Sequence, residues 1–231
     1  MHIKAAAFAA LLVCSWLPQV QAGVNVGTTR VVYQGQDKEA NLSVSNTDEN
    51  SPYLVQSWVS AYEDRNQSAD EFIMTPPLFR LDAQSQNILR IIATDVKQLP
   101  PDKESLFLIN VKAIPAAPAE QRDQNVLQIA LKTTIKLFYR PADLKGTLKE
   151  AVANLEWQVQ DGKLSVHNPS GFNVVVSELL VNGAADTQIP EVIRPGSTAK
   201  SAHPLKRGDT LVLSYINEYG STVKTDPVSV R

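Results

Sequence analysis

Side chains of the types that bind metals or carry out catalysis are few in this chain and far apart. Beyond residue 22 there are two histidines, His167 and His203, and neither has a neighbouring cysteine, histidine or acidic residue at a metal-ligand spacing. The sequence contains no glycine-rich phosphate loop and no nucleophile elbow. A Ser–His–Asp triad is assembled in space rather than along the sequence, so the scattered serines leave that alternative open. These patterns predict no metal site, no cofactor and no enzymatic activity.

The chemistry that the sequence does offer is hydrogen bonding by an extended strand with one apolar face. Residues 125–141 read NVLQIALKTTIKLFYRP. Alternate side chains of a strand point to opposite faces, and one face here carries Leu127, Ile129, Leu131, Thr133, Ile135, Leu137 and Tyr139. A period-two run of about 15 residues is long beside the usual roughly 5–6, and at about 3.3 Å per residue it spans roughly 50 Å. Part of this apolar row therefore extends beyond the core of a small domain, and donation of the strand to another chain is the use that fits.

Short strands separated by turn residues make up the rest of the first half of the chain. Apolar or alternating runs cover residues 29–33, 39–45, 53–62, 72–74, 87–93 and 106–114, and the prolines at 76, 77, 100 and 101 fall between them. Together with 125–141, they make about seven short strands with regular turn signals, which predict an immunoglobulin-like β-sandwich.

A second, smaller β domain is predicted after a change of composition around residues 142–152. Asp161-Gly162, between the runs 155–160 and 163–166, is a strong hairpin turn. Further runs cover residues 172–181, 210–216 and 222–230. We therefore expect an all-β protein with two domains, residues 23–142 and 143–231.

The first 22 residues have the pattern of a cleaved signal peptide. Lys4 supplies a positive start, residues 5–17 are apolar but too short to span a bilayer, and small residues at 20–22 suit cleavage; a buried N-terminal helix is the alternative. Cleavage removes Lys4 and the only cysteine, Cys14, so the formal charge of the remainder is 21 − 24 = −3. This charge argues against binding to nucleic acid or to an anionic membrane. No later apolar run is long enough for membrane insertion.

Several motifs, in order along the chain, resemble the PapD-like family, the periplasmic chaperones of the chaperone–usher pilus pathway. They are TRVVY at 29–33, PYLVQSW at 52–58, TPP at 75–77, DKESLF at 102–107, the segment 125–141, HNP at 167–169 and LSYINEYG at 213–220. The resemblance covers essentially the whole chain beyond residue 22. It implies two immunoglobulin-like β-sandwich domains in an L or boomerang arrangement, with a cleft between them.

The resemblance also implies a function. Members of this family bind pilin, or fimbrial, subunits in the periplasm and deliver them to an outer-membrane usher. A pilin is a sandwich that lacks its last strand, and the chaperone lends one by donor-strand complementation. On this interpretation Leu127, Ile129 and Leu131 fill the pilin groove, whereas Ile135, Leu137 and Tyr139 stay in the chaperone's own core. Ordinary core packing of the whole row is the alternative.

Two cations acquire a role through the same resemblance. Arg30 and Lys136 match a pair in the family's cleft that binds the C-terminal carboxylate of the pilin. Arg can hold a carboxylate with two parallel hydrogen bonds, and Lys adds a point charge. Lys136 lies on the face opposite Ile135 and Leu137, so it can reach the cleft while they pack inward. Such an anchor would fix the register of the added strand; two solvated surface cations are the alternative.

Three further charges, Glu104, Arg140 and Glu218, match an interdomain ion-pair set that holds the angle between the domains in the family. This chain has Glu218 where the family carries Asp. Three unrelated surface charges are the alternative.

Two other classes of protein compete with the chaperone. A structural surface or fimbrial β-sandwich protein, such as a pilin, would be one incomplete sandwich, whereas this chain has strands for two domains. A periplasmic enzyme built on a β-sandwich would need a polar cluster, and the sequence offers none.

Overall fold

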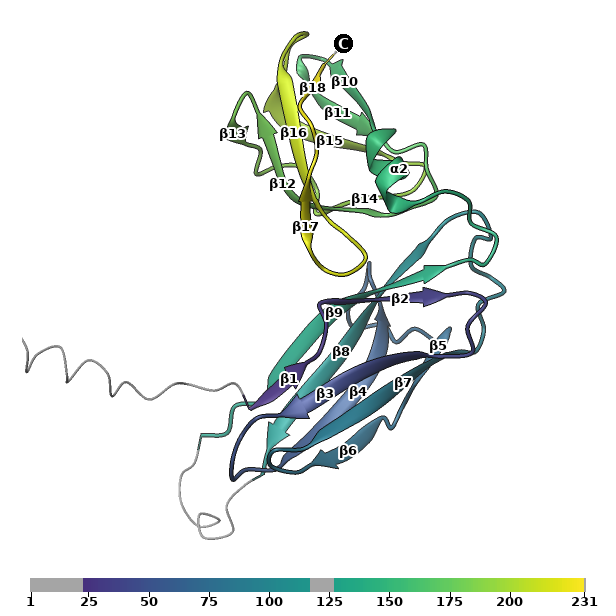
Figure 1. The fold of residues 1–231 in the computed structure, drawn as a ribbon, viewed down its shortest axis with the longest axis vertical. Helices are drawn as coiled ribbons and strands as arrows, with labels where there is room; N and C mark the ends of the chain where they lie inside the picture. The colour runs from purple at the N-terminus through teal and green to yellow at the C-terminus, as the bar shows by residue number, and fades with distance from the viewer. Residues whose placement is uncertain (1–22, 117–126, 231) are drawn as a thin grey trace, which may run out of the picture.

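The computed structural model describes residues 23–116 and 127–230, which form two β units (Figure 1). The predicted signal peptide, residues 1–22, lies outside the described residues. In Figure 1 the second unit sits on one end of the first, so that the molecule is long and bent. Within the described ranges, none of the helices is long and apolar enough to cross a membrane.

Two facing sheets build the first unit. One has the order β1 (Val24–Val26), β3 (Ala40–Asn46), β7 (Gln86–Ala93), β5 (Phe72–Thr75). The other has the order β2 (Arg30–Gln34), β9 (Leu131–Arg140), β8 (Ser105–Pro115), β4 (Tyr53–Ala61), β6 (Leu78–Leu81). The pairing of β2 with β9 is parallel, while β9 and β8 are antiparallel.

The alternation of side chains along each strand decides which of them fill the space between the sheets. In β3, Leu42 and Val44 are buried and Asn41 is exposed. In β9, Ile135 and Leu137 join the same core cluster. Full burial of such a side chain stabilises the fold by roughly 1.5–3 kcal/mol, so this unit is held by the alternating rows that the sequence displays.

The second unit also contains two sheets. β10 (Glu156–Gln160), β11 (Lys163–His167) and β15 (Thr198–Pro204) form one in that order. β13 (Ala184–Ala185), β12 (Val174–Val181), β16 (Thr210–Ile216) and β17 (Thr222–Lys224) form the other, with β14 (Val192–Ile193) paired to β12 and β18 (Val228–Ser229) paired to β16. The predicted hairpin at Asp161-Gly162 is confirmed, because Gln160 pairs with Lys163 and both turn residues have positive φ, 52° and 70°.

A short helix, α2 (Leu148–Ala153), is absent from the sequence prediction. Its signal is the spacing of Thr147 and Glu150, which is that of a capping box; the Thr147 hydroxyl accepts the backbone N–H of Glu150 at 3.2 Å. Leu148 and Val152 face the core of the second unit. Strands β1, β6, β13, β14 and β15 were also missed, because they are very short or, in β15, mostly polar.

The single long strand predicted over 125–141 is wrong in its first part. β9 begins at Leu131, residues 127–130 have no assigned strand, and 117–126 lie outside the described residues. The physical reason is that β8 stops pairing with this segment: among the described residues its last two, Ile114 and Pro115, pair with β4 only. The last pair with β8 joins Ala113 to Leu131, and β8 itself ends at Pro115. A strand forms only beside a neighbour that accepts its hydrogen bonds.

Candidate functional site: two cations at the end of an open strand edge

Strand β9 is flanked on both edges over only part of its length. One edge pairs with β8 from Leu131 to Tyr139. The other pairs with β2 only from Lys136, which lies opposite Arg30, to Arg140. Within the described part of the chain, no strand pairs with that second edge beside residues 131–135. We call this stretch the open edge of β9. Unpaired N–H and C=O groups of this kind are a template for an added strand.

The apolar row that leads into β9 and continues along it changes from exposed to buried where β2 begins. Leu127, Ile129 and Leu131 are 85%, 62% and 62% exposed, whereas Ile135 and Leu137 are 8% and 0% exposed. Ile129 and Leu131 border a hollow of about 190 Å³ that is also lined by Tyr53. The row thus has an inner half that builds the core and an outer half that contacts little of its own chain.

The two predicted cations meet at the boundary between these halves. Arg30 and Lys136 are register partners of the parallel pair β2–β9. Parallel pairing therefore brings together residues that are far apart in the sequence. Any strand that lies along the open edge, in line with β2, must end beside them.

Both cations are engaged by the second unit, which the sequence did not predict. The Arg30 guanidinium donates to the carbonyl of Ile216 at 3.2 Å and lies 5.7 Å from the Phe138 ring centroid. Its Nε is buried with no hydrogen-bond partner among the described residues. Burial lowers the pKa of Arg30, and the carboxylate of Glu191 opposes this shift. Lys136 forms an ion pair with Glu191.

The three predicted interdomain charges come together in one cluster. Arg140 Nη2 lies 2.9 Å from Glu104 Oε1, and Arg140 Nη1 lies 2.5 Å from Glu218 Oε1. The longer side chain of Glu218, compared with Asp, is therefore accommodated. Glu104 also accepts the backbone N–H of Asn173 at 2.9 Å. Burial raises the pKa of Glu104, and the adjacent Arg140 opposes this rise.

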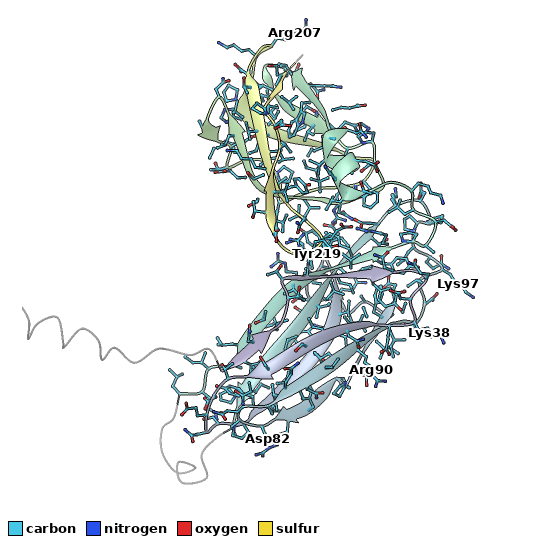
Figure 2. All side chains as sticks on the ribbon, in the orientation of Figure 1. Lys38, Asp82, Arg90, Lys97, Arg207 and Tyr219 are labelled. Carbon is cyan, nitrogen blue, oxygen red and sulfur yellow. The ribbon has the colours of Figure 1, made fainter. Side chains whose placement is uncertain are left out.

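Apolar side chains also join the two units, and sequence reasoning missed them. Leu106 and Phe138 of the first unit form a buried cluster with Val175 and Val192 of the second. Leu106 and Phe138 are register partners on the outer face of their sheet, the face that also carries Lys136. Figure 2 shows Tyr219, which is 87% exposed, on the loop after β16 at the junction of the units.

Replacing Arg140 by Ala is expected to loosen the angle between the units more than it destabilises either unit. Glu104 is buried partly by contacts with the second unit, at Asn173 and at Gly171, whose carbonyl accepts the Glu104 N–H. An unpaired buried carboxylate is costly, and opening the interface returns it to water. Small-angle scattering should therefore show a broader distribution of shapes.

Glu218→Ala is the matched control for Arg140→Ala. It removes only the more exposed partner of Arg140, with 36% of its side chain accessible, so the broadening should be smaller. A scattering profile of Arg140→Ala that equals that of the parent protein would contradict the assignment of this cluster to the domain angle.

Acidic, histidine and cysteine side chains do not gather at this site in the manner of a metal centre. Over the ranges that the structure describes, no group of three or more of them could hold a metal ion. The features that the site does present are an open strand edge, an exposed apolar row and two adjacent cations.

Comparison with known proteins adds an independent finding. A family model described as the pili and flagellar-assembly chaperone, PapD N-terminal domain, matches residues 23–145. A second, the pili assembly chaperone PapD, C-terminal domain, matches residues 150–227. The two matches together cover most of the chain.

Individual relatives are similar along nearly their whole length. The probable fimbrial chaperone LpfB of Escherichia coli O157:H7 is 39% identical over 218 residues, 93% of this chain and 92% of the relative. The periplasmic chaperone SfaE has a TM-score of 0.74 and 34% identity, covering 90% of this chain and 99% of its own. A chain in the structure of the Salmonella enterica SafA pilin in complex with the SafB chaperone has a TM-score of 0.76 and 32% identity, covering 90% and 96%.

Proposed function

Because the chain belongs to the PapD family of pilus-assembly chaperones, we propose that it captures pilin subunits in the periplasm by donating β9 and then delivers them to an outer-membrane usher. The fold of the family, two immunoglobulin-like domains, is the fold of this chain. The observation that carries the proposal is the open edge of β9, which ends at two cations and is preceded by the exposed apolar side chains of Leu127 and Ile129, with Leu131 at its start.

The direction of the captured strand follows from the position of β2 and from which end of the pilin binds the two cations. β2 is parallel to β9 and begins at Arg30, opposite Lys136. A pilin strand on the open edge ends at this pair. If its C-terminal carboxylate is the end that binds the cations, the strand runs in the same direction as β9. It then continues the line of β2.

The apolar row supplies the second half of the interaction. Leu127, Ile129 and Leu131 alternate along the chain and are exposed, so they can enter successive pockets of a sandwich that lacks one strand. From Leu127 to Lys136 the chain spans roughly 30 Å at about 3.3 Å per residue. The anchored carboxylate sets the register of these contacts, because a slip by one residue would turn the apolar side chains away.

Related chaperones support the nature of the partner and the compartment. The SafB chaperone is seen with a pilin, SafA, and SfaE is described as periplasmic. We propose the same partner class and compartment for this chain. Residues 1–22 are the proposed export signal, and residues 23–142 and 143–231 the proposed mature domains.

Membership of a chaperone family, rather than of an enzyme family, argues against the β-sandwich enzyme. The structural fimbrial protein remains the competitor to be tested. It would be incorporated into a surface fibre, whereas a chaperone leaves its subunit before assembly.

Co-production with a candidate pilin is the test of the proposed function. We expect a one-to-one complex in periplasmic extracts, and pilin that is degraded or aggregated when the chaperone is omitted. Size-exclusion chromatography with mass determination measures the stoichiometry. Recovery of this chain in purified surface fibres, with no soluble complex, would favour the structural protein instead.

A further inference from the structure

Lys136 is already occupied by a carboxylate in the free protein. Glu191, from the second unit, forms an ion pair with Lys136 Nζ through its Oε1. Its Oε2 accepts a hydrogen bond from the Tyr62 hydroxyl at 3.4 Å. The pKa of Glu191 is lowered, first by the hydrogen bond from Lys136. Lys136 therefore already pairs with a carboxylate before a pilin binds, and a carboxylate is also the group that the proposed function assigns to the pilin's C-terminus.

The fold of the second unit holds Glu191 in this place. Its carbonyl accepts the N–H of Val176 at 2.8 Å. The next residue, Val192, pairs with Val175 and is buried in the apolar cluster between the units. The backbone is thus fixed at Glu191 and at the residue that follows it, and the contact with Lys136 lies in the domain interface.

The exposed fractions of the two side chains indicate which partner can leave the ion pair at the lower cost. The side chain of Lys136 is 18% exposed, whereas that of Glu191 is 54% exposed. A carboxylate that is already half in water loses little when it returns to water completely. Lys136 is the more covered of the two and gains more from keeping an anion beside it.

We infer that Glu191 is an internal competitor for the carboxylate site, which it occupies in the free chaperone and vacates when the C-terminal carboxylate of a pilin binds Lys136. The inference rests on the proposed function. Two carboxylates at one ammonium repel each other, so capture is an exchange of one anion for another. The net gain is then the difference between the two ion pairs, and Glu191 sets how strongly the site discriminates in favour of a free C-terminus.

The experiment uses a synthetic peptide with the C-terminal strand of a candidate pilin, made once with a free C-terminal carboxylate and once as the amide. Titration calorimetry measures both peptides on the full chain and on Glu191→Gln, which keeps the shape of the side chain and removes its charge. We expect Glu191→Gln to bind the carboxylate peptide about two- to fivefold more tightly, as the loss of a partly exposed ion pair predicts. The affinity for the amide should not change.

Glu63→Gln is the matched control for Glu191→Gln. Glu63 also joins the two units, by an ion pair with Arg194, and its replacement changes the net charge by the same amount. It should leave the affinity for both peptides unchanged. In Lys136→Met, which has no ammonium to compete for, adding Glu191→Gln should give no further gain.

Three outcomes would overturn the inference. Unchanged or weaker binding of the carboxylate peptide by Glu191→Gln would mean that Glu191 does not compete. Equal gains for carboxylate and amide would mean that the effect is not an exchange of anions. In both cases, a parent protein that prefers the carboxylate peptide to the amide leaves the proposed function standing. If the parent protein binds the two peptides equally, carboxylate anchoring itself fails, and the inference fails with it.

Discussion

Replacing Lys136 by Met is expected to abolish recovery of a pilin complex while the fold stays intact. Met keeps the apolar stem and removes the charge from the site where Arg30 and Lys136 meet. Loss of a charge-assisted bond in a partly desolvated site weakens binding by about 2–5 kcal/mol, roughly 30-fold to several thousand-fold. Because the pilin must displace Glu191 from Lys136, we expect the lower half of this range. Co-purification from periplasm and a melting curve measure the two effects.

The control for Lys136→Met lies on the same strand. Lys132 is four residues away on the same face, is exposed, and lies 6.0 Å from the Trp58 ring centroid. Lys132→Met changes the net charge equally but does not adjoin Arg30, so it should bind pilin almost normally. Arg30→Ala should fail like Lys136→Met. Normal pilin recovery with Lys136→Met would count decisively against the carboxylate site.

The second large effect is a difference between two isoleucines of the same apolar row, in what their replacement does to stability and to pilin binding. Ile129→Ser should leave the free energy of unfolding within about 0.5 kcal/mol, because the side chain is 62% exposed. The same change should weaken the pilin complex by roughly 1.5–3 kcal/mol, the value of burying an aliphatic side chain. Ile135 is 8% exposed, so Ile135→Ser should lower the free energy of unfolding by about 3 kcal/mol or more, since it leaves a cavity and buries a hydroxyl.

Paired melting curves and pilin-binding assays decide this contrast. Both variants have the same residue type and belong to the same apolar row, so position along the row is the variable. If Ile129→Ser melts as early as Ile135→Ser, the whole row is core and strand donation by this chain is refuted. If Ile129→Ser binds pilin as tightly as the parent protein, Ile129 does not enter the groove.

The alternation of residues 125–141 was sufficient by itself to determine which face of β9 packs inward. It put Ile135 and Leu137 in one apolar row and Lys136 on the other face. The resemblance to a family then assigned Ile135 and Leu137 to the core, and they are buried there. The Asp161-Gly162 turn between two strand-like runs likewise determined a hairpin. These are local properties, because the period of side chains and the chemistry of a tight turn depend only on neighbouring residues.

Alternation could not determine where β9 begins or which of its edges is paired. Those depend on where β8 ends and β2 starts, and hydrogen-bond partners lie far away in the sequence. The resemblance to a family identified Arg30, Lys136 and the cluster of Glu104, Arg140 and Glu218. Residue types alone do not show that charged side chains far apart in the sequence lie close together in the fold.

Only the tertiary structure decided what faces the two cations. Glu191 carries no motif that marks it, and the motif at 213–220 that contains Ile216 does not indicate a contact with Arg30. Each reaches its position because the second unit docks on the first. That docking depends on the apolar contact of Leu106 and Phe138 with Val175 and Val192. Side chains on the outward face of a strand are buried only when another domain covers them, and no periodicity within one strand records that event.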